Sequence, residues 1–173
     1  YSLNMKINIG GETKKEGWIN YNVQKKPNVD IVGNINDLSQ FENESVEEIY
    51  ASHVIEHVDQ KTIKKTFKDI FRILKKKGKF YVSVPDMDVL CHFFVSPLAN
   101  QQTKFHTMRM IFGGQIDNYD YHYFGWNYEF MSEFLKKAGF LNIKRVGSFG
   151  LFNDTSDYKP YGFPISLNVI AIK

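Results

Sequence analysis

One segment constrains the fold of this chain more than any other, because it joins a helix pattern directly to a strand pattern. In TIKKTFKDIFRILKKKG (62–78), apolar residues recur at helical spacing and form one stripe, made of Ile63, Phe67, Ile70, Phe71 and Leu74. The next residues, KFYVSVP (79–85), are rich in β-branched and aromatic side chains, as strands are. Strands that alternate with amphipathic helices predict an α/β fold with a largely parallel sheet covered on both faces.

The helix in this segment is expected to continue through three lysines, Lys75 to Lys77, and to stop at Gly78. Cations suit the C-terminal end of a helix, where the backbone dipole is negative, and glycine is a common stop. We interpret the other lysines of the helix as a solvated face rather than a nucleic-acid site. The net charge of +3 is too small to indicate nucleic acid by itself.

The rest of the chain continues the alternation and indicates a single domain over residues 1–173. Strand patterns occupy residues 6–10, 18–22, 29–33, 46–52, 141–149 and 166–173. Helix patterns occupy residues 86–95, 100–112 and 127–139, and Asp86 and Asn127 can cap the first and last of these. We interpret residues 1–4 as a cloning remnant before a natural start at Met5.

Composition excludes several classes of protein. The chain has a single cysteine, Cys91, so it has no intrachain disulfide framework, and we expect a cytoplasmic protein. No apolar run is long enough to span a bilayer, which argues against a membrane partner. The 15 Phe and 10 Tyr predict an aromatic core. The long unperiodic loop 114–126 is of the kind that is often functional.

The segment ASHVIEHVD (51–59) contains the pattern His53-x-x-Glu56-His57, which occurs in one class of zinc hydrolases. Such an enzyme needs both histidines on one long helix and a third ligand from elsewhere, for which Glu129 or Glu133 could serve. The residues before His53 read instead as a strand, so His53 should lie at its carboxyl end. We therefore assign no metal ligands and keep a zinc-dependent hydrolase as an alternative.

The order and spacing of several motifs resemble the class I S-adenosylmethionine-dependent methyltransferases, in particular their small type-11 members. The family's first strand typically reads LNLGCG, and this chain has INIGGE followed by GWINYNV. The family's SHVLEH, RVLKPGG and VPD motifs correspond to SHVIEH, RILKKKG and VPD here. The resemblance implies a doubly wound, mostly parallel Rossmann-like methyltransferase sheet with an antiparallel C-terminal strand. It also implies S-adenosylmethionine as cofactor and a small-molecule acceptor.

The resemblance assigns a cofactor-binding role to residues at four strand ends. Gly10 and Gly11 would let the backbone pass close to the methionine part of the cofactor. Asn22 stands where the family has a carboxylate for the ribose, and Asn34 and Ile35 stand near the adenine. The resemblance also implies that Ser52 and His53 bind the cofactor, and we add Glu12 to this set as our own hypothesis.

The resemblance also suggests how the acceptor is handled. A base need only remove a proton from an oxygen or nitrogen acceptor, and His53 has the best location, with Asp86 and His122 behind it. Four aromatic residues of the long loop could wall the acceptor site or fill the core, namely Tyr119, Tyr121, Tyr123 and Trp126.

Three departures from the family pattern keep a second function open. Glu12 replaces the third glycine, and asparagines replace both carboxylates, which loses charge assistance to the cofactor's hydroxyl groups. Glu12 itself could restore one carboxylate. The alternative is a methyltransferase-fold protein that binds a ligand or partner without catalysis.

The crossover from Glu12 to Gly17 is too short for a helix, so the nicotinamide-dinucleotide fingerprint does not apply. The short sheet edge at residues 12–28 leaves room for a second copy, so a homo-oligomer stays open.

Overall fold

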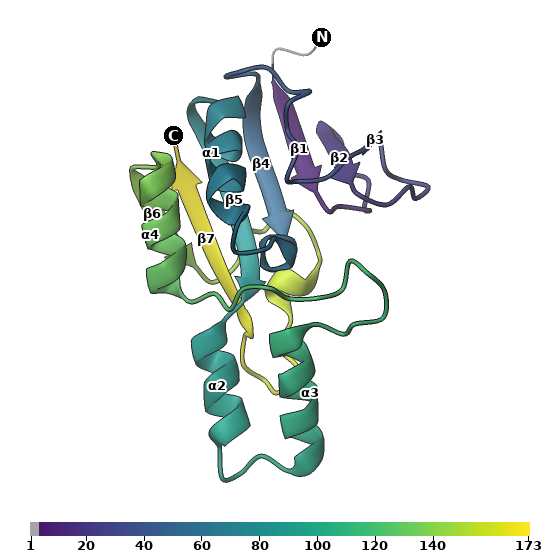
Figure 1. Ribbon diagram of the computed structural model, residues 1–173, viewed down its shortest axis with the longest axis vertical. Helices are drawn as coiled ribbons and strands as arrows, with labels where there is room; N and C mark the ends of the chain where they lie inside the picture. The colour runs from purple at the N-terminus through teal and green to yellow at the C-terminus, as the bar shows by residue number, and fades with distance from the viewer. Residues whose placement is uncertain (1–3) are drawn as a thin grey trace.

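The computed structural model describes residues 4–173, so the interpretation of residues 1–4 as a remnant falls almost wholly outside the described part (Figure 1). The strands are β1 (Met5–Ile9), β2 (Trp18–Asn22), β3 (Ile31–Val32), β4 (Val46–Ser52), β5 (Leu74–Pro85), β6 (Asn142–Val146) and β7 (Ser166–Ile172). The helices are α1 (Ile63–Ile73), α2 (Met87–Val95), α3 (Gln101–Phe112) and α4 (Tyr128–Ala138), with 3-10 turns η1 (Ile55–His57) and η2 (Thr155–Asp157).

All the strands form one sheet in the order β3-β2-β1-β4-β5-β7-β6. β1 to β5 pair in parallel, whereas β7 is antiparallel to both β5 and β6. The predicted fold class, a mostly parallel Rossmann-like sheet with an antiparallel C-terminal strand, is confirmed. The strand order reverses between β1 and β4, and sheets of this kind bind ligands in the crevice outside the carboxyl ends of the strands at such a reversal.

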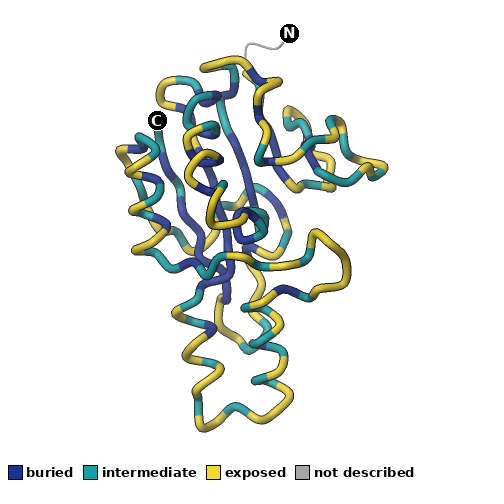
Figure 2. Tube along the Cα trace, viewed as in Figure 1, coloured by how far each residue is buried: buried dark blue, intermediate teal, exposed yellow. Residues whose placement is uncertain are grey.

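The two faces of the sheet are covered differently. Successive side chains of a strand point to opposite faces. Ile49 and Phe80 therefore join the main core under α1 and α4, and Tyr50 and Tyr81 point the other way and pack against the loop 147–165 through Phe152. Figure 2 shows the central strands buried between these two covers. Helices thus cover one face, and a loop with the single turn η2 takes their place on the other.

The prediction for the end of the first helix is wrong. α1 ends at Ile73, and Lys75 to Lys77 belong to β5, so Gly78 does not stop the helix. Leu74 already pairs with Val46 of β4. Sheet pairing has therefore overridden the local helix preference of the lysine run, as tertiary contacts often do. The strand expected at residues 29–33 is also shorter than predicted, since only Ile31 and Val32 pair with β2.

Three helices begin where the sequence indicates. Asp86, Asn100 and Asn127 each accept a hydrogen bond from a backbone N–H in the first turn of α2, α3 and α4. α2 and α3 pack as a hairpin that extends beyond the carboxyl end of β5 (Figure 1). In the described part of the chain, no helix is long and apolar enough to cross a membrane.

Candidate active site

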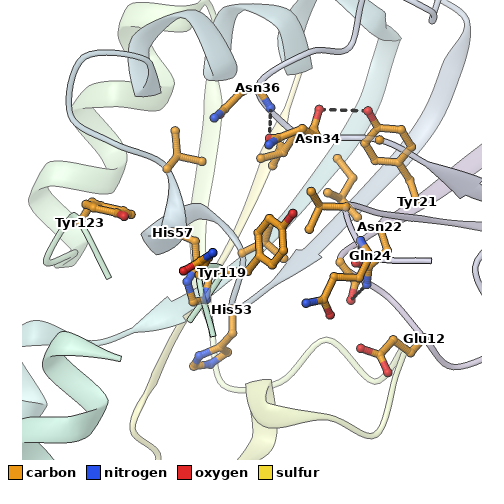
Figure 3. Close-up of a pocket in the computed structure, with 18 residues that line it drawn as sticks. Glu12, Tyr21, Asn22, Gln24, Asn34, Asn36, His53, His57, Tyr119 and Tyr123 are labelled. Carbon is orange, nitrogen blue, oxygen red and sulfur yellow. Dashed lines mark hydrogen bonds between the residues drawn. The ribbon is translucent and has the colours of Figure 1, made fainter. Parts of the chain in front are cut away.

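A cleft opens at the carboxyl ends of the parallel strands. Gly10 follows β1, Asn22 ends β2, Asn34 lies two residues after β3, and His53 follows β4, and all four line this cleft (Figure 3). These residues are far apart in sequence, and the parallel sheet brings them to one edge. The other lining residues are Ile9, Glu12, Tyr21, Val23, Gln24, Gly33, Ile35, Asn36, Val54, His57, Val58, Asn118, Tyr119 and Tyr123.

Gly10 shapes the floor of the cleft through its backbone. Its φ of +77° lies in the left-handed region, which other residues adopt only at a cost. Its N–H donates to the carbonyl of Tyr21 at 2.7 Å, which holds the ends of β1 and β2 together. A Cβ on Gly10 would lie 2.4 Å from Cγ2 of Val54, another lining residue. Glycine at this position therefore keeps the wall of the cleft in place.

The two asparagines that replace the expected carboxylates make local hydrogen bonds. The Asn22 amide donates to the Gly10 carbonyl at 3.1 Å and accepts from the Gln24 N–H at 2.9 Å. An aspartate could not donate to that carbonyl, which gives a structural reason for asparagine here. Asn34 is exposed, and its side chain accepts from the Asn36 N–H at 2.9 Å. Both side-chain oxygens keep a second lone pair for a ligand.

The sequence and the fold of this chain are similar to those of known methyltransferases. Residues 8–82 match a family model described as a methyltransferase domain. A methyltransferase from Archaeoglobus fulgidus, described as SAM dependent, superposes with a TM-score of 0.63 at 16% identity, over 99% of this chain and 86% of that one. A protein from Thermotoga maritima described as a SAM-dependent methyltransferase, possible histamine N-methyltransferase, gives a TM-score of 0.61 at 16% identity, over 100% and 84%. The chain therefore has the fold of these methyltransferases.

A third similar structure contains ligands. The Burkholderia thailandensis 1,6-didemethyltoxoflavin-N1-methyltransferase, with bound 1,6-didemethyltoxoflavin and S-adenosylhomocysteine, superposes with a TM-score of 0.61 at 12% identity, over 98% of this chain and 70% of that one. No functionally curated protein has a significantly similar sequence. The resemblance to class I methyltransferases is therefore confirmed, and at these identities the solved structures support the fold alone.

His53 lies in the turn between β4 and η1. Its φ of +54° is unusual for a residue other than glycine. Its Nε2 lies 2.8 Å from the Ser166 hydroxyl oxygen, whose hydrogen is donated to the Thr155 carbonyl at 2.9 Å. Ser166 must then accept from His53, so we assign the proton to Nε2. The other ring nitrogen, Nδ1, lies 3.3 Å from a carboxylate oxygen of Glu56. Both nitrogens thus have neighbours inside the protein.

Glu56 is a fully buried carboxylate beneath the cleft. Burial favours its neutral form, but contact with His53 and the nearby His57 and His122 outweigh burial and hold its pKa below the ordinary value. The pKa of His122 is lowered, because burial disfavours its charged form more than Glu56 favours it. The rings of His57 and His122 meet edge to face with centroids 4.8 Å apart. An acidic group and three histidines therefore share one environment.

Several predicted site residues lie outside the cleft. Asp86 lies in a different pocket beside α2, where it caps the helix and pairs with Arg145 at 2.7 Å. Burial raises the pKa of Asp86 despite this arginine. His122 does not line the cleft either, so of the three predicted catalytic residues only His53 does. Gly11 and Ser52 line a smaller adjoining pocket, where Ser52 donates to Asp154 at 3.2 Å.

The aromatic residues of the long loop divide between cleft and core. Tyr119 and Tyr123 line the cleft and are each about half exposed, whereas Tyr121 is exposed but does not line it. Trp126 is fully buried and stacks on Phe124 at a centroid distance of 4.0 Å, so of the two roles left open for it, wall of the acceptor site or core, it takes the core. Its aromatic neighbours in the core, besides Phe124, are Phe67 and Phe134.

The sequence interpretation missed some residues of the cleft. Gln24 lines it and donates to Asp117 at 3.3 Å, which ties the end of β2 to the 113–127 loop. Its place just after a strand is a signal that could have found it. Asn118 gave no such signal, because it lies in a loop without periodicity. The long helix that a hydrolase of the His53-x-x-Glu56-His57 type needs is absent from the described residues, since β4 ends at Ser52 and η1 holds only three residues.

Proposed function

We propose that this chain binds S-adenosylmethionine in the cleft and transfers its methyl group to a small acceptor. One observation carries the proposal: Gly10, Asn22, Asn34 and His53, from four strand ends, line one cleft of a methyltransferase fold. When bound, the cofactor supplies a methyl group activated on a sulfonium. The protein then has mainly to position the acceptor and exclude water.

The cofactor side of the cleft fits this role. Gly10 and Gly11 keep side chains away from the turn after β1, where a Cβ on Gly10 would meet Val54. Asn22 would accept from the ribose hydroxyls, and Asn34 and Ile35 would border the adenine. Glu12, on the rim, would supply the carboxylate that the asparagines lack. It now pairs with Lys26. Ser52, in the adjoining pocket, would support this side of the site from behind.

The acceptor side of the proposal rests on His53, Tyr119 and Tyr123. In Figure 3, His53 and Tyr119 lie between Tyr123 on one side and Asn22 on the other. His53 is the proposed base, and it would have to release Ser166 or Glu56 to take a proton from the acceptor. Asp86 and His122 do not line the cleft, so the proposal gives them positioning roles. Asp86 fixes the start of α2, and His122 lies next to His57.

A second candidate is a methyltransferase-fold protein that binds a ligand or partner without catalysis. Two observations favour it: the asparagines at the ribose and adenine positions, and the internal contacts of both His53 ring nitrogens. For the first candidate we propose a small-molecule acceptor and a cytoplasmic location. The second candidate transfers no methyl group and therefore needs no acceptor.

Titration calorimetry with S-adenosylmethionine and S-adenosylhomocysteine tests the proposal. We expect saturable binding of both. Glu12→Gln should weaken binding by roughly fivefold, because a partly exposed charge-assisted hydrogen bond is worth about 1 kcal/mol. Glu16→Gln is the matched control, since Glu16 is exposed in the same crossover but does not line the cleft. An unchanged affinity in Glu12→Gln would refute its role. No binding of either ligand at millimolar concentration would refute the function.

A further inference from the structure

Three potential metal ligands meet beside the cleft. Glu56 and His57 come from η1, and His122 comes from the 113–127 loop, more than 60 residues later. One ligand atom of each lies within 4.8 Å of the others. The proposed methyl transfer uses none of these three as a contact to cofactor or acceptor, so the group needs its own explanation.

The Glu56 carboxylate indicates what is missing. It is fully buried, and neither of its oxygens has a hydrogen-bond partner among the described residues. The Nδ1 atom of His53 is 3.3 Å from one of these oxygens, but it has no hydrogen to donate there when the proton of this ring is on Nε2. Buried carboxylates are normally paired or hydrogen-bonded, because an unpaired buried charge is very costly. Both free oxygens are therefore available to a cation.

The two histidines are held in the manner of metal ligands. His57 Nδ1 lies 3.0 Å from the carbonyl of Tyr121, and the backbone carbonyl of Met110 faces the His122 ring and favours its protonated form. A carbonyl only accepts, so each ring carries a proton on the nitrogen that faces it. When either ring is neutral, its other nitrogen has a lone pair to offer a metal ion. Metal-binding histidines almost always donate their second N–H in this way, which fixes the tautomer and the ring orientation.

We infer that Glu56, His57 and His122 form a site for one divalent transition-metal ion of the zinc type. Two imidazoles and one carboxylate form a donor set that suits zinc, and cobalt takes the same ligands. Bonds of about 2.1 Å in a tetrahedral site place ligand atoms about 3.4 Å apart. The present limit of 4.8 Å therefore has to contract by about 1.4 Å, which rotation of the three side chains can supply.

The site differs from the hydrolase pattern considered at first. In the sequence, His53 and His57 were the candidate pair, and the structure places His122 with Glu56 and His57 instead. His53 Nδ1 lies 3.3 Å from the Glu56 carboxylate, and its other ring nitrogen faces Ser166. An ion here would fasten the 113–127 loop to η1. Since Tyr119 and Tyr123 of that loop line the cleft, occupancy would fix the acceptor side of the pocket.

Metal titration in the absence of cofactor tests this inference apart from the proposed function. The chelator-treated protein is titrated with Co²⁺ and followed by its visible absorption, and Zn²⁺ is then added as a competitor. We expect one equivalent of Co²⁺ with tetrahedral intensity, displaced by one equivalent of Zn²⁺, and a higher Tm with Zn²⁺. His122→Ala should bind at least about tenfold more weakly and show no rise in Tm.

His92→Ala is the matched control, because His92 is an exposed histidine on α2 whose Nδ1 also faces a backbone carbonyl, that of Asp88. It should bind as the unchanged protein does. Glu56→Gln keeps the shape and removes the charge, and circular dichroism checks that each variant is folded. Equal Co²⁺ binding by the unchanged protein and His122→Ala would overturn the site, as would no binding of either ion. Cofactor binding would then still be judged by its own calorimetry.

Discussion

The turn at Gly10 allows a quantitative test of how the cleft is built. In Gly10→Ala, two costs should add. Alanine at a φ of +77° costs about 1–2 kcal/mol, partly offset by a gain of about 0.4–1 kcal/mol from a less flexible unfolded chain. The new Cβ would also lie 2.4 Å from Val54 Cγ2, and overpacking of this kind costs typically about 1–3 kcal/mol. We therefore expect a loss of about 3 kcal/mol in the free energy of unfolding.

Two other glycines separate these costs. Gly17 has a φ of +79°, but an added Cβ there would meet nothing within 4 Å, so Gly17→Ala should show the backbone cost alone, about 1 kcal/mol. Gly147 has neither a positive φ nor a close neighbour, so Gly147→Ala should be nearly neutral. In Gly10→Ala combined with Val54→Ala, the steric part should be recovered and appear as a coupling energy.

Urea denaturation followed by circular dichroism measures all of these variants, and thermal unfolding gives a second reading. For a chain of this size, a loss of about 3 kcal/mol lowers Tm by roughly 6–12 °C. A loss in Gly10→Ala no larger than in Gly17→Ala would refute the steric argument. A coupling energy near zero between Gly10→Ala and Val54→Ala would refute it as well.

Three further outcomes follow from caps and buried charges. Asn127→Ala should lower stability by about 1 kcal/mol in urea, because Asn127 caps α4. Burial raises the pKa of Tyr50 and of Tyr81, so their contribution to the free energy of unfolding is complete below pH ~10 and is lost as the pH rises through the raised values. Phenolate absorbance should show these two tyrosines ionising at higher pH than the others, and Tyr50→Phe should lose less stability at alkaline pH. Burial also raises the pKa of Asp86, so the protein's stability relative to Asp86→Asn should be highest below pH ~4 and fall as the pH rises, as urea unfolding at several pH values would show.

Much of the fold followed from local pattern. The strands at Trp18–Asn22 and Val46–Ser52 have the predicted bounds, and Asp86 and Asn127 cap helices as expected. Turn and cap chemistry acts within a few residues, so one sequence suffices to locate it. The end of α1 did not follow, because the pairing of Leu74 with Val46 is a contact between distant segments.

The site was predictable only in part, for the same reason. Strand ends could be located, and the sheet brings Gly10, Asn22, Asn34 and His53 to one edge. Nothing in the pattern could show that Asp86 pairs with Arg145 away from the cleft. The placement of His122 depends on how a loop without periodicity crosses the molecule. These contacts join segments whose relation is decided by tertiary packing.

The position of β7 also bears on the order in which the molecule can assemble. β7 is the last strand in the sequence, yet it lies between β5 and β6, and β6 pairs with no other strand in the described sheet. β6 therefore reaches the sheet only through β7, whose partner residues in β5 lie more than 80 positions earlier. Contacts this distant in sequence form slowly. Until β7 pairs with it, β5 presents an unpaired sheet edge, and a helper protein or a misfolding partner could bind there.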